Sequence, residues 1–391
     1  MNLNKLQVTD DLQEQIAYGR ELMDTYDSDM LKFINSIYDS YVNGGGKLPL
    51  SQQDMLCKAT YDYWMYGFTP EQQIYFQLFN KTHEEKKLYM SFRSEYLYYA
   101  RLNAKADMNC LEDKYEAYKL LKPDFKREVI KISSEEDYPQ FLDFIGRHPK
   151  YVLKPLGLSN TKGVKFIDST KYEDKKALYL TMLNAGESFT GDYTVKWCKH
   201  DSAVLEELID MDPEFGAHSP KSLNIIRIPT VRVNGKVYVY GAYTKIGGSD
   251  ELIVGESRNA YMCGVDCETG ELVTNGFTED GKELEYHPVS GLKFKGFKFP
   301  KWDELIKMLH EMAIQLKPTI NYVGWDVVLT PKGWVIVEGN YYGQTLWQVV
   351  YKRGMAKEFG DLIGWHMEEG KPWWKYKINQ IEKSAGLHDI D

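Results

Sequence analysis

Two predicted hairpins in the second half of the chain constrain its fold more than any other feature. Their β-rich runs lie at residues 223–233, 236–246, 323–329 and 334–338. Asn234-Gly235 joins the first pair and is the strongest short signal for a tight hairpin turn. The second pair flanks the turn Thr-Pro-Lys-Gly at residues 330–333, and a helix is predicted at residues 302–316. The second half of the chain is therefore expected to be dominated by sheet.

The first part of the chain has a different pattern. Residues 1–105 carry apolar and aromatic side chains at helical spacing, and Thr69-Pro70-Glu71-Gln72 combines a cap residue, an N-terminal proline and a capping-box glutamine. Short strands alternating with capped helices follow, as at residues 129–132 and 151–154. We therefore predict an α+β protein with a mostly helical N-terminal region ending near residue 105. The many tyrosines of that region are expected to pack rather than to form a stacking surface.

Charge and cysteine usage restrict the partners and the compartment. The 48 Lys+Arg against 57 Asp+Glu give a formal net charge of −9, which disfavours binding to nucleic acid or to an anionic membrane. No stretch has the roughly 18 apolar residues of a membrane helix, so membrane insertion is not expected. Five cysteines, an odd number, fit a reducing compartment, and the expected location is cytoplasmic.

The last predicted hairpin carries oxygen ligands. Side chains alternate across a strand, so Glu338 and Asn340 share one face, and Asp326 joins them if the register places it opposite. Carboxylate and amide oxygens suit Mg²⁺ held jointly with substrate phosphates. The alternative is an ordinary half-exposed hairpin with polar positions.

A second candidate site follows the strand at residues 151–154. This strand ends in Lys154 and runs into a loop rich in Gly, Ser and Thr, which offers a fixed cation and many backbone N–H groups to a polyphosphate. Lys114, about forty residues earlier at the start of a predicted helix, can supply a second cation. The loop residues assigned to phosphate binding are Gly157, Ser159, Lys162 and Gly163. The alternatives are a solvent-exposed lysine and a flexible hairpin, and the sequence does not match a Walker A loop.

The apolar strand that begins near residue 203 is interrupted by two adjacent acids. Glu206, Glu207, Leu208 and Ile209 can pair with an adenine edge through the backbone while one acid binds the ribose hydroxyls. This interpretation requires the segment to act as a hinge between two subdomains.

In this order, the motifs resemble the ATP-grasp superfamily, and most closely its sugar-transfer-associated branch, which occurs with polysaccharide and capsule genes. The resemblance covers roughly residues 108–350. It depends on the segments at residues 111–121, 222–227, 287–291, 299–302 and 322–326, together with the N-terminal stretch at residues 63–70. It implies an ATP-grasp fold, with two α/β lobes enclosing ATP at residues 106–205 and 206–391. It also implies ATP and Mg²⁺ as cofactors.

The resemblance implies roles for three further residues. Arg227 matches the strand arginine that contacts the terminal phosphate and the acyl phosphate, Lys245 occupies the paired strand, and Asn259 matches an asparagine that holds the transferring phosphoryl group. The residues after Asn259 depart from the paired glycines usual in the family.

The implied activity is an ATP-dependent ligase that joins a small-molecule carboxylate to an amine or hydroxyl through an acyl phosphate. The amide product is favoured, and the acceptor is expected to be a sugar or a peptide-like molecule. The alternatives are a kinase and a non-catalytic nucleotide-binding partner of a polysaccharide assembly system.

Overall fold

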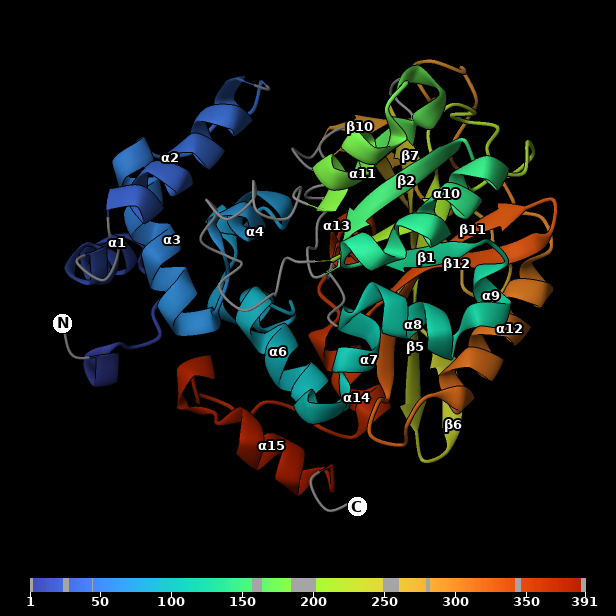
Figure 1. Cartoon of the computed structure of the whole chain (residues 1–391). Helices are drawn as coiled ribbons and strands as arrows, with labels where there is room; N and C mark the ends of the chain where they lie inside the picture. The colour runs from blue at the N-terminus through green and yellow to red at the C-terminus, as the bar shows by residue number, and fades with distance from the viewer. Residues whose placement is uncertain are drawn as a thin grey trace.

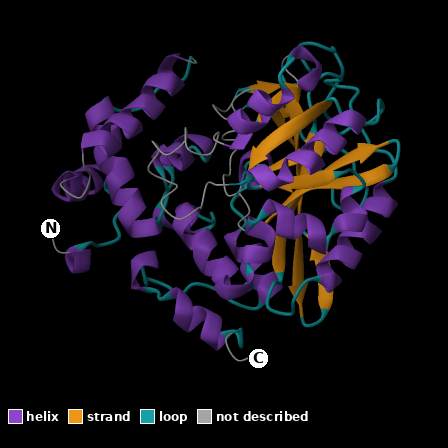
Figure 2. Cartoon of the chain, in the orientation of Figure 1, coloured by secondary structure: helices purple, strands orange, loops and turns teal. Residues whose placement is uncertain are grey.

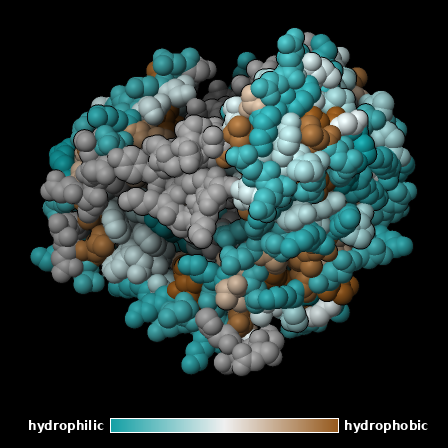
Figure 3. All heavy atoms as spheres, viewed as in Figure 1, coloured by the Kyte–Doolittle hydropathy of each residue, from teal (hydrophilic) through white to brown (hydrophobic). Residues whose placement is uncertain are grey.

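The computed structural model describes residues 3–23, 28–43, 45–156, 164–183, 202–248, 260–278, 282–341 and 346–387. Within these ranges the chain forms a helical N-terminal region beside two β-sheets with helices packed against them (Figures 1 and 2). This is the α+β mixture expected from the sequence. The face shown in Figure 3 is mostly hydrophilic, with hydrophobic residues in separate patches.

The N-terminal region is helical, as its spacing predicts. Its α-helices are α1 (Leu12–Leu22), α2 (Ser28–Asn43), α3 (Gln52–Tyr66), α4 (Pro70–Tyr75), α5 (His83–Lys87) and α6 (Phe92–Ala100). The predicted capping box at the start of α4 is present, because Thr69 and Gln72 cap each other's backbone N–H and Pro70 occupies the first turn. Across the described ranges, every helix lacks the length and apolar character needed to cross a membrane.

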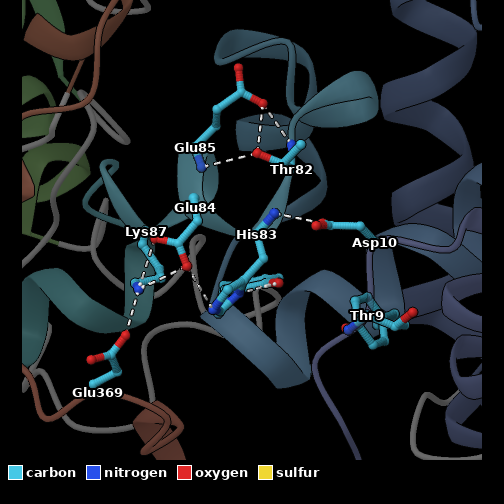
Figure 4. A network of polar contacts seen from close by, with 10 residues as sticks. Thr9, Asp10, Thr82, His83, Glu84, Glu85, Lys87 and Glu369 are labelled. Carbon is cyan, nitrogen blue, oxygen red and sulfur yellow. Dashed lines mark hydrogen bonds and ion pairs between the residues drawn. The ribbon is translucent and has the colours of Figure 1, made fainter.

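Polar contacts around α5 join the N-terminal segment to the C-terminal segment (Figure 4). The backbone N–H of His83, at the start of α5, donates to Asp10 at 2.6 Å. At the other end of α5, Lys87 donates to Glu369 at 3.0 Å and to Glu84 at 3.1 Å. The N-terminal segment, α5 and the C-terminal segment are therefore joined by one network.

The smaller sheet contains β1 (Val129–Ile132), β2 (Lys150–Pro155), β3 (Lys165–Asp168) and β4 (Ala203–Glu207), in the order β1-β4-β2-β3 with every pair antiparallel. Before it lie α7 (Asn109–Glu112), α8 (Lys114–Leu120) and α9 (Lys122–Phe125). The helices α10 (Tyr138–Arg147) and α11 (Lys175–Leu183) cover one face. There Phe141, Phe144 and Tyr179 pack against Tyr151 and Leu205.

The larger sheet has the order β10-β9-β8-β7-β5-β11-β12, with β6 paired to β5. Its strands are β5 (Ile225–Val233), β6 (Lys236–Val239), β7 (Tyr243–Gly247), β8 (Ala260–Gly264), β9 (Gly276–Phe277), β10 (Glu283–Leu284), β11 (Tyr322–Thr330) and β12 (Gly333–Asn340). The predicted run at 236–246 is split into β6 and β7. Gly241, which has a φ of 72°, separates them, because a Cβ at this position would lie 1.9 Å from the ring of Trp347.

Helices cover both faces of the larger sheet. On one face, α12 (Trp302–Gln315) packs Leu305 and Leu309 against Ile226 and Trp325. On the other face, α6 and the C-terminal helices α13 (Trp347–Val350) and α14 (Ala356–Ile363) form a second apolar cluster around Tyr243. The final helix, α15 (Ile378–Ser384), packs against α6.

The end of α6 is fastened to the start of β11. Tyr99 stacks on Tyr322 with ring centroids 4.3 Å apart, and the Asn103 side-chain oxygen accepts hydrogen bonds from the backbone N–H groups of Asn321 and Tyr322 at 2.9 Å. Because β11 carries Asp326, the N-terminal region holds the strand on which the predicted metal site is built.

Candidate active site

The smaller sheet brings together three residues predicted to bind the nucleotide. Lys154 in β2 pairs with Glu206 in β4 at 2.9 Å, and Val152 is the direct cross-strand partner of Glu206. Lys114 begins α8 after the cap residue Asp113, and its ammonium donates to the backbone oxygen of Leu156 at 3.4 Å. Both predicted lysines therefore reach the same end of β2.

Glu206 has a second cationic partner, Arg127, that sequence reasoning missed. The Nε and Nη2 atoms of Arg127 donate to one Glu206 oxygen at 3.0 and 2.8 Å, while Lys154 contacts the other oxygen. Arg127 lies two residues before the strand β1, and no local pattern distinguishes it from other charged residues near strands.

The two cations keep Glu206 ionised although it is buried. Burial alone would raise the pKa of Glu206, but the charges of Lys154 and Arg127 outweigh that effect and lower its pKa from 4.5 to about 2. These three residues carry two positive charges against one negative charge, so the cluster is suited to an anionic ligand such as a phosphate.

The remaining hinge residues lie beside Glu206. Glu207 faces the other way, accepts a hydrogen bond from the Glu128 backbone N–H at 2.9 Å and pairs with Lys332 at 3.4 Å. Leu208 and Ile209 follow the end of β4 and are half-buried. The carboxylate of Glu207 is therefore engaged with the protein in this structure.

A second group of predicted residues lies side by side across three strands of the larger sheet. Arg227 in β5 is opposite Asp326 in β11, which is opposite Glu338 in β12. Arg227 engages both oxygens of Asp326 in a two-pronged pair, with Nη2 2.9 Å from Oδ2. Both side chains are 7% exposed. The register that the metal hypothesis requires for Asp326 is thus present.

Asn340 completes this group from the same face of β12. Its side-chain nitrogen donates to Glu338 at 3.2 Å and lies 3.5 Å from the backbone oxygen of Gly324, its cross-strand partner. The three predicted ligands are all oxygen donors, the type that Mg²⁺ prefers. Among the described residues no cluster of three or more His, Cys, Asp or Glu side chains is placed to hold a metal. The set fits an ion whose other ligands come from substrate phosphates.

Arg227 lies in an acidic and aromatic environment. Burial alone would lower its pKa, but Asp326 is the strongest of the opposing influences, and the pKa of Arg227 is raised above its ordinary value. Its cross-strand partner in β7, Tyr243, is fully buried, and its hydroxyl has no hydrogen-bond partner among the described residues. Burying a hydroxyl without a hydrogen bond costs folding free energy. Tyr243 is, after Arg127, a second residue that sequence reasoning missed.

Lys245 lies in β7, two residues from Tyr243, with Ile225 and Met262 as cross-strand partners. It is half-buried and shares a face of the sheet with Arg227. The phosphate-loop residues Gly157, Ser159, Lys162 and Gly163, and the predicted catalytic residue Asn259, lie outside the described residues.

Comparison with known proteins returned several ligases. No curated protein sequence matches the chain. D-alanyl-alanine synthetase A from Vibrio cholerae has 11% identity and a TM-score of 0.40, covering 72% of this chain and 67% of its own. N5-carboxyaminoimidazole synthetase from Staphylococcus aureus, complexed with ADP, has 9% identity and a TM-score of 0.38, covering 63% and 48%. A RiPP-associated ATP-grasp ligase from Chryseobacterium gregarium, in complex with ADP and a leader and core peptide, has 15% identity and a TM-score of 0.38, covering 67% and 62%. The chain thus spans about half to two thirds of these proteins.

The family comparison is more specific. The profile described as "Sugar-transfer associated ATP-grasp" matches residues 93–361, well over half of the chain. The match includes both sheets and begins in α6, within the helical region. It confirms the expected family and the ATP-grasp fold, and the chain belongs to the sugar-transfer associated ATP-grasp family.

Proposed function

We propose that this protein is an ATP-dependent ligase that joins a carboxylate to an amine, or to a hydroxyl, through an acyl phosphate. The observation that carries the proposal is the presence of two clusters of charged residues, one associated with each sheet. Lys114, Lys154 and Glu206 form a cation-rich cluster, while Arg227 lies beside oxygen ligands on the larger sheet. This arrangement suits a nucleotide whose terminal phosphate reaches from the first group to the second.

The proposed reaction has two steps. A carboxylate oxygen of the acid attacks the terminal phosphorus of ATP, the bond to the bridging oxygen breaks, and ADP leaves. The amine or hydroxyl then attacks the acyl carbon, phosphate departs with the electron pair of the broken C–O bond, and the nucleophile gives up its proton.

In this proposal the protein acts by positioning and by charge. Lys114 and Lys154 hold the phosphates, and Arg227 neutralises charge on the phosphoryl group as it moves. Asp326, Glu338 and Asn340 would hold magnesium, which when bound neutralises negative charge on the phosphates. No protein nucleophile is required.

The family description, sugar-transfer associated ATP-grasp, supports a substrate that carries a sugar. We extend the proposal to a cytoplasmic location; the described cysteines Cys57, Cys110, Cys263 and Cys267 are all unpaired. We also propose the division at residues 1–105, 106–205 and 206–391. The second boundary falls within β4 (Ala203–Glu207), so the last two residues of the smaller sheet lie just past it.

The proposal is tested by trapping acyl phosphates with hydroxylamine. The protein, ATP and Mg²⁺ are incubated with a panel of acids, and hydroxamate, ADP and phosphate are measured. We expect hydroxamate and ADP to form with at least one acid, and Glu338→Gln to lower the rate by about 100-fold or more. Glu285→Gln, at an exposed ion pair with Lys293, is the matched control and should retain full activity.

The other outcomes point to other functions. A phosphorylated product without release of phosphate would indicate a kinase. Tight ADP binding with no turnover on any acid would indicate a non-catalytic nucleotide-binding protein. Full activity of Glu338→Gln would remove Glu338 from the site.

A further inference from the structure

Arg127 connects the two sheets through a fully used guanidinium group. Its Nε and Nη2 atoms donate to Glu206 at 3.0 and 2.8 Å on the smaller sheet. On the larger sheet, Nη1 donates to the backbone oxygen of Ile336 at 2.5 Å and Nη2 to that of Val337 at 3.3 Å. The remaining Nη1 hydrogen reaches the oxygen of Phe125 at 3.3 Å. All five donors of the guanidinium are therefore engaged.

The contact on the larger sheet falls on an irregularity in β12. Asp326 pairs with Glu338 and Val327 pairs with Ile336, so Val337 is the extra residue of a β-bulge. β12 is also the last strand of this sheet in the described part of the chain, where no strand pairs with its outer edge. Arg127 satisfies two consecutive carbonyl groups at that edge, which a regular strand would direct to opposite sides.

The bulge is next to the predicted metal site. Glu338 directly follows Val337, so the bulge helps to determine how Glu338 faces Asp326. At its other end Arg127 holds Glu206, the buried carboxylate of the predicted nucleotide hinge. Arg127 thus contacts Glu206 on one sheet and the residue before Glu338 on the other, without belonging to either set of predicted ligands.

We propose that Arg127 is a positioning residue that couples nucleotide binding at Glu206 and Lys154 to the placement of Glu338. This inference rests on the proposed nucleotide site. Its physical basis is that a phosphate would compete with Glu206 for the Lys154 ammonium and draw it away. Glu206 is buried, so it keeps its charge during that exchange only if a second cation remains. Arg127 is that cation, and the same guanidinium transmits the change to β12.

A lysine cannot reproduce this geometry. The guanidinium is a rigid planar fork with five donors, whereas an ammonium is a compact charge with three donors. Arg127→Lys should therefore keep a counter-charge for Glu206 and lose the bonds to the Ile336 and Val337 carbonyls. Arg127→Met loses both.

The test measures ADP binding by calorimetry and amide hydrogen exchange of β12, each with Mg²⁺. In the unmodified protein, ADP should slow exchange at residues 335–339 by about fivefold or more. Arg127→Lys should bind ADP within about threefold of normal but should no longer transmit this protection. Arg127→Met should bind ADP about tenfold more weakly or worse. Arg147→Lys, at a half-exposed arginine paired with Glu128 in the same lobe, is the control and should behave as the unmodified protein.

The outcomes separate the coupling from the nucleotide site. If Arg127→Lys binds ADP and β12 responds as in the unmodified protein, the coupling is wrong and the nucleotide site stands. The same holds if ADP leaves β12 unchanged in the unmodified protein. If the unmodified protein does not bind ADP, both the proposed function and the coupling fail. Exchange of β1 and β4 without ADP shows whether each variant is folded, and Arg127→Lys suffices should Arg127→Met fail to fold.

Discussion

The buried pair between Arg227 and Asp326 should have a large and measurable effect on stability. Both side chains are 7% exposed, and both oxygens of Asp326 accept hydrogen bonds from the guanidinium. Asp326→Asn preserves the shape of the side chain but leaves Arg227 buried without its counter-ion. Breaking such a pair costs about 3 to 5 kcal/mol. Glu338, which also raises the pKa of Arg227, compensates in part, so we expect a value near the lower limit, about 3 kcal/mol.

Amide hydrogen exchange is the suitable assay because it reports the opening of single strands in a chain with several lobes. About 3 kcal/mol corresponds to roughly 100-fold faster exchange of β5 and β11. Peptides from β2, in the smaller sheet, serve as the internal reference. Glu285→Gln removes one partner of an exposed pair of similar length, 2.9 Å, and should change stability by less than about 1 kcal/mol.

A double variant separates the cost of the unpaired charge from the cost of losing the two side chains. Replacing both residues, as Arg227→Met with Asp326→Leu, removes the uncompensated charge, so its cost should be smaller than that of Asp326→Asn alone. The reasoning is refuted if Asp326→Asn leaves exchange of β11 within about fivefold of normal. It is also refuted if the double variant loses as much stability as the single variants Arg227→Met and Asp326→Leu together.

Three further predictions concern buried polar groups. The folded pKa of Glu206 is about 2, below its ordinary value of 4.5. Its ionised form therefore stabilises the fold above about pH 4.5, and this stabilisation, up to about 3 kcal/mol, is lost as the pH falls towards 2. Urea unfolding of Glu206→Gln should lack this pH-dependent contribution. Tyr243→Phe removes a buried hydroxyl that has no hydrogen-bond partner among the residues that the structure describes, so the melting temperature should stay equal or rise. A fall of several degrees would show that the hydroxyl has a partner. Asp62 pairs with Lys58 at 2.7 Å and with Lys86 at 2.9 Å, and all three side chains are at most 2% exposed. Asp62→Asn should therefore lower the free energy of unfolding in urea by about 3 kcal/mol or more. A decrease below about 1 kcal/mol would contradict the burial argument.

Local patterns predicted the parts of the site that lie within one hairpin. Strand alternation placed Glu338 and Asn340 on one face of β12, and the structure pairs Asp326 with Glu338. The same kind of reasoning joined β6 and β7 into one strand, because a run of β-forming residues does not reveal what packs against it. Gly241 was the available signal for the break, since an isolated glycine within a strand pattern often marks a close approach.

Contacts between distant residues could not be predicted in this way. Arg127 reaches Glu206 and the carbonyl of Ile336, which are 79 and 209 residues away, and no periodic pattern links such positions. The sequence also assigned Arg227 to a phosphate and Asp326 to a metal as separate roles. Their mutual pairing depends on the register between β5 and β11, strands that are separated by β6 to β10 along the chain.

The pairings suggest how the proposed site would respond to a nucleotide. Lys154 is paired with Glu206, and Arg227 with Asp326, so two of the cations assigned to phosphates are each held by a carboxylate in this structure. A phosphate that takes the place of a carboxylate at either cation gains only the difference in free energy between two ion pairs, not the full strength of one. The carboxylates released in this exchange have different fates. Glu206 retains Arg127, whereas Asp326 lies opposite Glu338 and needs a new positive charge. A magnesium ion arriving with the phosphates would supply that charge, so nucleotide and metal should bind this site together more readily than either binds alone.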